Sequence, residues 1–372
     1  MERIAATALT TTSAEQLMAE LRQPAWRARQ LLEWIYQRKA ESFESMTNLP
    51  ATLRAGLAER IDLQPLTLAR VQGSGDTTRK FLWRLHDDRL VETVLIPASP
   101  ALYGSRSDRL TLCVSSQVGC AYACKFCASG LAGFTRNLST GEIVSQVLAA
   151  ARHSGQRIDN LVFMGMGEPL ANLRNLLPAL EILNAPWGLG IGARHMTIST
   201  SGLAPQIERL SKLPLQIRLA ISLHGASDEV RDRIMPINQR YPIERLFESL
   251  RFWRQHKAQK LTFEYILIDH INDDLEQASL LARHARELGA KVNLIPYNTV
   301  HGLPWERPSI GRQEAFFNQL RKRGVTATLR REKGHDIDAA CGQLRLQEET
   351  AVGLIQDTPT PIAPAPAGHA PS

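Results

Sequence analysis

The feature that most constrains the fold is a regular alternation, from residue 108 onward, between short apolar segments and longer amphipathic ones. The apolar segments have the length and composition of buried strands: LTLCVS, NLVFMG, HMTIST, IRLAISL, LTFEYILI, KVNLIPY and VTATLR. Apolar residues recur at helical spacing between them, in residues 140–152, 173–183, 205–210, 242–256, 274–288 and 312–323. Repeated βα units of this kind predict a parallel sheet with helices on its outside.

The number of strands limits the architecture further. Six strands precede the last one, which is too few for a closed eight-stranded barrel. We therefore predict an α/β fold, a partial barrel of six βα units, as the core over residues 108–350. In such folds the functional groups follow the carboxyl ends of the strands, so the search for a site begins there.

Three further segments flank this core. Residues 1–65 show helical spacing and predict a small helical accessory domain. Residues 66–107 contain two period-two segments separated by His86-Asp87-Asp88, which predicts a β-hairpin extension. Residues 351–372 are rich in proline and alanine and lack apolar periodicity, so we expect a disordered tail without a catalytic role.

Cysteine usage and charge narrow the class of protein. The chain has five cysteines, an odd number, and three of them fall within eight residues, which is poor geometry for a disulfide framework. The amino-terminal residues lack an apolar signal segment, and no stretch is apolar enough to span a membrane. These features favour a cytoplasmic protein with no membrane partner. A net charge of +7 is compatible with RNA, although ordinary enzymes also reach it.

The clustered cysteines form the motif C-x3-C-x2-C, which consists of Cys120, Cys124 and Cys127. Three thiolates at this spacing can converge on one soft metal centre. A structural zinc ion would need a fourth ligand from a second half-site, and the sequence has no second CxxC or HxxxH. A four-iron cluster held by three cysteines would keep one iron open for a substrate. The alternative is a set of buried thiols without a metal.

With an aromatic residue before its third cysteine, this motif resembles the signature of the radical S-adenosylmethionine superfamily. Further motifs resemble the radical adenine methyltransferases of 23S rRNA and tRNA: SSQVGC (115–120), GFTRNL (133–138), MGMGEPL (164–170), STSG (199–202), AISLHG (220–225), NLIPYN (293–298) and DIDAACGQL (336–344). The resemblance extends from about residue 24 to residue 344. It implies one [4Fe-4S] cluster with three cysteine ligands, and two molecules of S-adenosylmethionine in each turnover.

The resemblance also implies which residues contact the cofactor. Gly167 and Glu168 match the segment that holds the amino group of S-adenosylmethionine, and a carboxylate beside a glycine suits an ammonium group. The other implied contacts are Ser199, Ser222, Leu223, His224 and Asn298. Each of these residue types also has an ordinary local role, as a turn residue or a helix cap, so their joint placement at predicted strand ends is what favours a site.

The two remaining cysteines and one carboxylate acquire roles through the same resemblance. Cys341 is implied to carry a methyl group as S-methylcysteine, and Cys113 is implied to resolve an enzyme–RNA adduct through a transient disulfide with Cys341. Glu92 is implied to be the proton acceptor. Without the resemblance, each cysteine would be interpreted as a small buried apolar residue, and Glu92 as a solvated carboxylate on an exposed strand position.

The implied reaction is the formation of 2-methyladenine at the peptidyl-transferase centre of 23S rRNA and beside the anticodon of tRNA. Implied partners are these two RNAs and an electron donor such as flavodoxin or ferredoxin, and the protein is expected to be a monomer. The helical accessory domain, residues 1–65, resembles the part of the family that recognises RNA. Basic segments at 26–30, 251–260 and 330–333 are candidate RNA contacts, although solvated helix faces are the simpler interpretation. Two alternatives stay open: methylation at C8 of adenine by a related enzyme, and an iron–sulfur RNA-binding protein without catalysis.

Overall fold

One mixed sheet of ten strands organises the computed structural model, which describes residues 3–73, 77–98, 109–131, 133–299 and 303–330. Its strand order is β14-β13-β12-β11-β10-β9-β6-β5-β4-β3. The parallel strands are β6 (Leu110–Cys113), β9 (Asn160–Phe163), β10 (Met196–Thr200), β11 (Arg218–Ser222), β12 (Thr262–Leu267), β13 (Lys291–Pro296) and β14 (Ala327–Leu329). This arrangement confirms the predicted α/β partial barrel.

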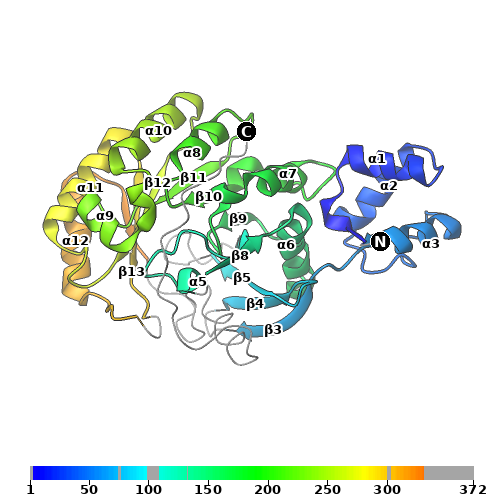
Figure 1. Cartoon of the computed structure of the whole chain (residues 1–372), viewed down its shortest axis with the longest axis horizontal. Coiled ribbons are helices and arrows are strands. Elements are labelled where there is room, and N and C mark those ends of the chain that lie inside the picture. Colours follow the sequence, from blue (N-terminus) through cyan, green and yellow to red (C-terminus); the bar gives the residue numbers. More distant parts are fainter. Residues whose placement is uncertain (1–2, 74–76, 99–108, 132, 300–302, 331–372) are drawn as a thin grey trace.

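Helices cover the outer face of the parallel strands, as Figure 1 shows. They are α6 (Thr140–Ser154), α7 (Leu173–Asn184), α8 (Ala204–Ser211), α9 (Asp228–Ile234), α10 (Ile243–His256), α11 (Leu275–Leu288) and α12 (Ile310–Lys322). Short 3-10 helices at Pro169–Asn172 and Ala193–His195 join α7 to the strands before and after it, and one at Pro236–Gln239 joins α9 to α10. The sequence predicts these helices to within a few residues, with the exception of α9, which it does not predict.

The alternation of side chains along the strands separates a core face from an inner face. On β12, Phe263 and Tyr265 are buried against the helices, whereas Glu264 and Ile266 point inward. The register places Ser222, Glu264 and Asn293 side by side on neighbouring strands, so all three share the inner face. The polar residues within the apolar strands therefore meet on one surface of the sheet.

Helix α6 illustrates how local signals fix the outer layer. Its first turn has a capping box, in which the Ser139 hydroxyl accepts from the Glu142 amide at 3.2 Å and the Glu142 carboxylate accepts from the Ser139 amide at 2.8 Å. The helix ends at Gly155, whose φ of 65° is left-handed. Ile143 and Val147 lie on its buried face, and full burial of such side chains contributes about 1.5–3 kcal/mol each.

The extension before the barrel has one strand more than predicted. Strands β4 (Arg79–Arg84) and β5 (Leu90–Pro97) form the expected antiparallel hairpin, and β3 (Thr67–Gly73) adds a third strand at its edge. Strand β5 pairs antiparallel with β6, which makes the extension continuous with the barrel sheet. The edge strand β3 is mostly exposed and therefore lacks the period-two apolar signal.

The amino-terminal residues form a helical unit at one end of the molecule (Figure 1). It contains α1 (Thr11–Glu20), α2 (Trp26–Leu32), a π-helical turn (Glu33–Gln37) and α3 (Ala51–Arg60), with a short parallel pair of β1 (Ile4–Ala5) and β2 (Ile61–Asp62) that the sequence does not predict. The unit packs on α6: the Thr7 hydroxyl donates to the Gly141 carbonyl at 2.9 Å and contacts the Ser145 hydroxyl at 2.7 Å.

Candidate active site

A cavity of about 350 Å³ opens at the carboxyl ends of the parallel strands, a volume within the range of small-molecule sites. Most of the residues that the sequence analysis singled out line it: Cys120, Cys124, Cys127, Gly167, Glu168, Ser199, Ser222, His224 and Asn298. Leu223 is fully buried in the core beside this wall and is not among the lining residues. Segments far apart in the sequence thus converge on one space.

The three cysteines lie on a loop enclosed by a small antiparallel ladder, β7 (Gln117–Gly119) and β8 (Phe134–Asn137), which the sequence does not predict. The Cys120 amide donates to the Gly133 carbonyl at 3.0 Å, and the Cys127 amide donates to the Cys124 carbonyl at 3.0 Å. Gly119 has a φ of 77°, and a Cβ atom there would overlap the Gly133 carbonyl. The backbone therefore fixes the loop independently of any metal.

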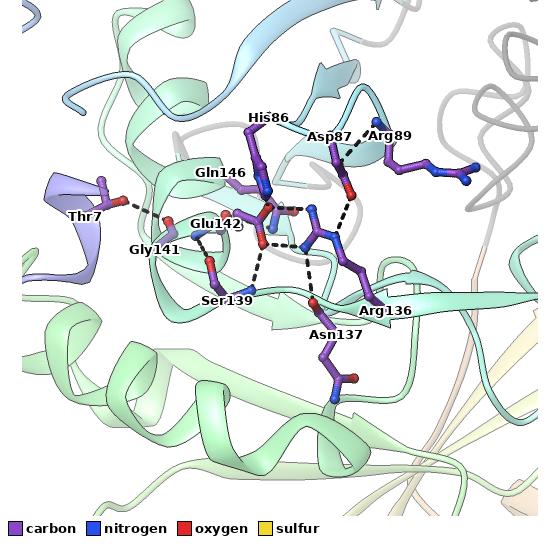
Figure 2. A network of polar contacts seen from close by, with 10 residues as sticks. All are labelled: Thr7, His86, Asp87, Arg89, Arg136, Asn137, Ser139, Gly141, Glu142 and Gln146. Carbon is purple, nitrogen blue, oxygen red and sulfur yellow. Dashed lines mark hydrogen bonds and ion pairs between the residues drawn. The ribbon is translucent and has the colours of Figure 1, made fainter. Parts of the chain in front are cut away.

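Polar contacts in Figure 2 anchor this loop to the rest of the fold. Arg136 of β8 donates to both carboxylate oxygens of Glu142 at 2.8 and 2.9 Å, and to Asp87 of the hairpin turn at 2.7 Å. The Arg136 hydrogen bond holds the pKa of Asp87 below its usual value, and the Glu142 and Asp87 contacts raise the pKa of Arg136. One guanidinium thus joins the cysteine loop, α6 and the β4–β5 turn.

The thiols of the cavity carry the electrostatics of a metal-binding donor set. Burial is the main cause that raises the pKa of Cys120 to about 12, and the nearby Cys127 adds to it. Burial and the two other thiols also raise the pKa of Cys124. Burial and mutual repulsion therefore disfavour the thiolates, and a cation bound among them would stabilise them.

The donor set is compatible with an iron–sulfur cluster. Three thiols line one cavity, and thiolates are the ligands that hold such clusters. Within the described residues, no three His, Cys, Asp or Glu side chains form a site for a single metal ion. The cavity has room beside the thiols, so a cluster held by these three cysteines would keep one iron open to a second molecule.

Glu168 is held rigidly at the cavity wall. One of its carboxylate oxygens accepts from the Ser201 amide at 2.8 Å and the Ser201 hydroxyl at 2.9 Å, and the other accepts from the Leu170 amide at 3.0 Å. Burial nevertheless raises the pKa of Glu168 above its ordinary value. A buried carboxylate in this state gains most from a cation, such as an ammonium group, that enters the cavity.

His224 has a defined tautomer. Its Nδ1 accepts from the Ile266 amide at 3.0 Å, so the proton of the neutral ring lies on Nε2. Burial lowers the pKa of His224 to about 3, and the nearby Arg231 adds to this shift. The ring packs edge-on against Phe126 of the cysteine loop, with centroids 4.9 Å apart. His224 is therefore a neutral donor next to the cluster loop.

The cavity wall also contains Glu264, Asn293 and Arg330. The sequence predicts no cofactor contact for them and places Arg330 only within a basic segment. Asn293 donates to Glu264 at 2.7 Å, and burial raises the pKa of Glu264. The sequence carries a signal for Glu264, because a carboxylate interrupts the apolar strand LTFEYILI. Among the predicted residues, the hydroxyls of Ser199 and Ser222 lie 3.2 Å apart, and Asn298 accepts from Arg307 at 2.6 Å.

The remaining predicted residues lie outside this cavity. Cys113 is the register partner of Val94 on the neighbouring strand β5. Glu92 lies two residues before Val94 on that strand, so Cys113 and Glu92 share one face of the sheet. Glu92 is buried and forms an ion pair with the buried Lys80 at 3.4 Å, so the alternative of a solvated carboxylate is wrong. Cys341 lies outside the described residues, as do the RNA-contact candidates beyond position 330.

The partial barrel with a three-cysteine loop at its carboxyl-terminal edge defines a radical S-adenosylmethionine protein. The model of the Radical SAM superfamily matches residues 114–282, and that of the ribosomal RNA large subunit methyltransferase N-terminal domain matches residues 7–63. The chain belongs to the RlmN family of dual-specificity RNA methyltransferases, because its similarity to curated members extends over nearly its whole length. The family resemblance predicted from the motifs is confirmed.

Three relatives illustrate this similarity. The probable dual-specificity RNA methyltransferase RlmN of Akkermansia muciniphila is 52% identical over 344 residues, which cover 92% of this chain and 96% of that protein. The probable dual-specificity RNA methyltransferase RlmN 3 of Opitutus terrae is 53% identical over 92% of this chain and 95% of its own. The crystal structure of a radical SAM methyltransferase from Sphaerobacter thermophilus matches with a TM-score of 0.86 and 45% identity, over 91% of this chain and 98% of that one.

Within the described residues, no helix combines the length and the apolar character that crossing a bilayer requires.

Proposed function

We propose that this chain is a radical methyltransferase that forms 2-methyladenine in 23S rRNA, at the peptidyl-transferase centre, and in tRNA, beside the anticodon. The observation that carries the proposal is the convergence of Cys120, Cys124 and Cys127 with Glu168 and His224 on one cavity. Membership of the RlmN family supplies the substrate class, since its members bear the name of dual-specificity RNA methyltransferases. C2 of adenine is electron-poor, and radical chemistry avoids the unfavourable transfer of a methyl cation to it.

In this proposal the three cysteines hold a [4Fe-4S] cluster, and two molecules of S-adenosylmethionine are used in each turnover. When bound, the cluster supplies the electron that cleaves S-adenosylmethionine to a 5′-deoxyadenosyl radical. The chain orients the cofactor: Glu168 receives its ammonium group, while Ser199, Ser222 and Asn298 present hydroxyl and amide groups to its polar edges. The neutral Nε2–H of His224 adds a donor at the same wall. Leu223 supports this wall from the core.

The remaining residues act on the methyl group and the RNA. Cys341 accepts a methyl group by displacement from one S-adenosylmethionine and, after loss of a hydrogen atom, adds its methylene carbon to adenine. The adduct radical then loses one electron, which the oxidised form of the electron-donor protein would take up, and its ring proton, which passes to Glu92. The Cys113 thiolate attacks the Cys341 sulfur and forms a disulfide. The bond from sulfur to the methylene carbon breaks, and this carbon keeps the electron pair and takes a proton from water, which gives the methyl group on adenine. An external reductant restores both thiols.

We also propose that the protein acts in the cytoplasm, with the partners that this reaction requires. The RNA must present an unstacked adenine, because a base that is stacked inside an RNA helix cannot enter the cavity at the edge of the barrel. An electron donor such as flavodoxin or ferredoxin would reduce the cluster. The protein would act as a monomer.

The resolving role of Cys113 gives a direct test. The variant Cys113→Ala should accumulate a covalent enzyme–RNA species under anaerobic turnover, visible as a band of reduced mobility on a denaturing gel. The double variant Cys113→Ala/Cys341→Ala is the matched control and should give no such band, because the methyl carrier is gone. Normal turnover by Cys113→Ala would contradict the proposed mechanism.

A further inference from the structure

Arg231 of α9 is a buried cation that the sequence analysis did not single out. Its side chain is fully buried, with an exposed fraction of 0%. Burial lowers the pKa of Arg231 to about 10, so the guanidinium is still charged at neutral pH. A full positive charge inside a protein is unfavourable unless polar groups surround it, which makes its partners informative.

The partners are the carboxyl ends of two strands that wall the cavity. Arg231 donates to the carbonyls of Ser201 after β10, at 3.0 Å, and of Leu223 after β11, at 2.5 Å. It also donates to the Ser222 carbonyl at 3.4 Å. These carbonyls belong to or adjoin the residues that face the cavity, so the guanidinium fixes the spacing between the two strand ends.

The same helix also contacts the cysteine loop. The carbonyl of Ile234, at the end of α9, accepts from the amide of Lys125, which directly follows Cys124, at 3.0 Å. The Cys124 thiol interacts electrostatically with the guanidinium. Helix α9 therefore joins the strand ends to the loop that carries the three cysteines.

The charge of Arg231 is balanced only indirectly. Its Nε donates to the amide oxygen of Asn238 at 2.9 Å, and the Asn238 amide donates in turn to Asp228 and Asp232, both at 2.9 Å. The Asn238 side chain thus lies between the guanidinium and the two carboxylates. The groups that accept directly from the guanidinium are neutral carbonyl and amide oxygens. A purely structural tie between carbonyls would not need a charge, because neutral amide or hydroxyl donors bind them as well.

We propose that Arg231 is a positioning residue that holds the β10 and β11 strand ends against the cysteine loop and raises the reduction potential of the cluster. Reduction adds one negative charge to the cluster, and a nearby cation in a dry interior stabilises that charge. This inference rests on the proposed function, since it assumes that the three cysteines hold a cluster.

The test is an anaerobic redox titration of the reconstituted full chain without S-adenosylmethionine. Electron paramagnetic resonance measures the reduced cluster at each potential. In Arg231→Gln, the equilibrium constant for reduction should fall at least tenfold, which for one electron is a shift of 59 mV to more negative potential. Arg233→Gln is the matched control, because it removes a charge from an exposed position on the same helix and should leave the potential unchanged. An Arg231→Gln protein with a full cluster and the wild-type potential would overturn the inference.

A second variant covers the case in which Arg231→Gln does not fold. Arg231→Lys keeps the charge but cannot reach the carbonyls of both strand ends with one ammonium group. The equilibrium constant for reduction of this variant should stay within threefold of the wild-type value. Its affinity for S-adenosylmethionine should fall at least tenfold. Unchanged binding, or a potential shift of tenfold or more, would overturn the inference. A wild-type chain that assembles no four-iron cluster would instead overturn the proposed function itself.

Discussion

At the scale of single residues, position 167 requires glycine for two separate reasons. Its φ of 93° lies in the left-handed region, where side chains are strained, and a Cβ atom there would overlap Gln117. Gln117 is not free to move, because its side chain accepts from the Glu168 amide at 2.9 Å and donates to Asn137 at 2.8 Å. The close approach of two backbones thus sets the position of Glu168.

This geometry predicts a local defect in Gly167→Ala. The overlap with Gln117 should displace Glu168, so we expect S-adenosylmethionine binding to weaken at least tenfold and the free energy of unfolding to fall by about 3 kcal/mol. Calorimetric titration and urea unfolding measure the two effects.

Gly155→Ala is the control for strain without overlap. Its φ of 65° is also left-handed, but a Cβ atom there would meet nothing within 4 Å. The free energy of unfolding should fall by only about 1 kcal/mol and binding should be unchanged. If both variants bind S-adenosylmethionine like the wild type, the proposed role of this segment is wrong.

At the scale of elements, Arg136 ties the β7–β8 ladder to the rest of the fold. Its guanidinium contacts both Asp87 of the hairpin turn and Glu142, and His86 of the same turn lies 3.5 Å from a Glu142 carboxylate oxygen (Figure 2). The Glu142 side chain is 5% exposed, so the loss of Arg136 would deprive a buried carboxylate of its charged partner. The cysteine loop is attached to the fold through this network.

We therefore expect Arg136→Gln to lower the free energy of unfolding by about 2 kcal/mol and to reduce the iron bound after reconstitution several-fold. Urea unfolding and iron analysis provide the measurements. Arg84→Gln on the same hairpin is the control, because its pair with Asp88, at 3.7 Å, is exposed and contributes little. Equal iron content in Arg136→Gln and Arg84→Gln would contradict this role.

Helix α2 carries the most suitable surface for an RNA base. Trp26 is 57% exposed, and the Arg27 guanidinium lies 4.1 Å from its ring centroid. By contrast, Arg251 in the second basic segment is paired with Glu244 at 2.9 Å and Glu287 at 2.8 Å, which supports the simpler interpretation of that segment as a solvated helix face. An exposed aromatic ring next to a cation is the usual platform for a stacked base.

Trp26→Ala should therefore weaken the binding of an rRNA fragment by about 1–3 kcal/mol, or roughly 5- to 150-fold. Fluorescence anisotropy with labelled RNA measures this loss. Ile310→Ala on α12 also removes an exposed apolar side chain, which is 73% exposed in the wild type, and should bind normally. Wild-type affinity in Trp26→Ala would exclude this ring from the RNA surface.

At the scale of the whole molecule, the sequence predicts an element wherever burial requires apolar residues at a regular spacing. The parallel strands bury one face against the helices and, apart from β14, contain many buried apolar residues, so their apolar segments mark them closely. The helices between them follow from their spacing. Strand β3 and helix α9 were not predicted, because the strand is mostly exposed and the helix, DEVRDRI, is short and mostly charged. The ladder that encloses the cysteine loop is too short to show any period.

The site follows the same rule. The motifs identify the residues that line the cavity, but they do not reveal partners from other strands. Lys80, which pairs with Glu92, and Arg231, which binds three carbonyls, become visible only when the strands are assembled. Glu264 is an intermediate case, because its charge within an apolar strand is a local signal that the motifs do not include.

The central claim is that this cavity methylates C2 of adenine through radical chemistry. The most direct measurement is mass spectrometry of the nucleosides formed when the anaerobically reconstituted chain, with a reductant and S-adenosylmethionine, acts on a 23S rRNA fragment that contains the peptidyl-transferase-centre adenine. We expect 2-methyladenosine together with 5′-deoxyadenosine from the wild type, and no methylated nucleoside from Cys341→Ala. The appearance of 8-methyladenosine would contradict the proposed ring position, and the absence of 5′-deoxyadenosine would contradict the radical chemistry altogether.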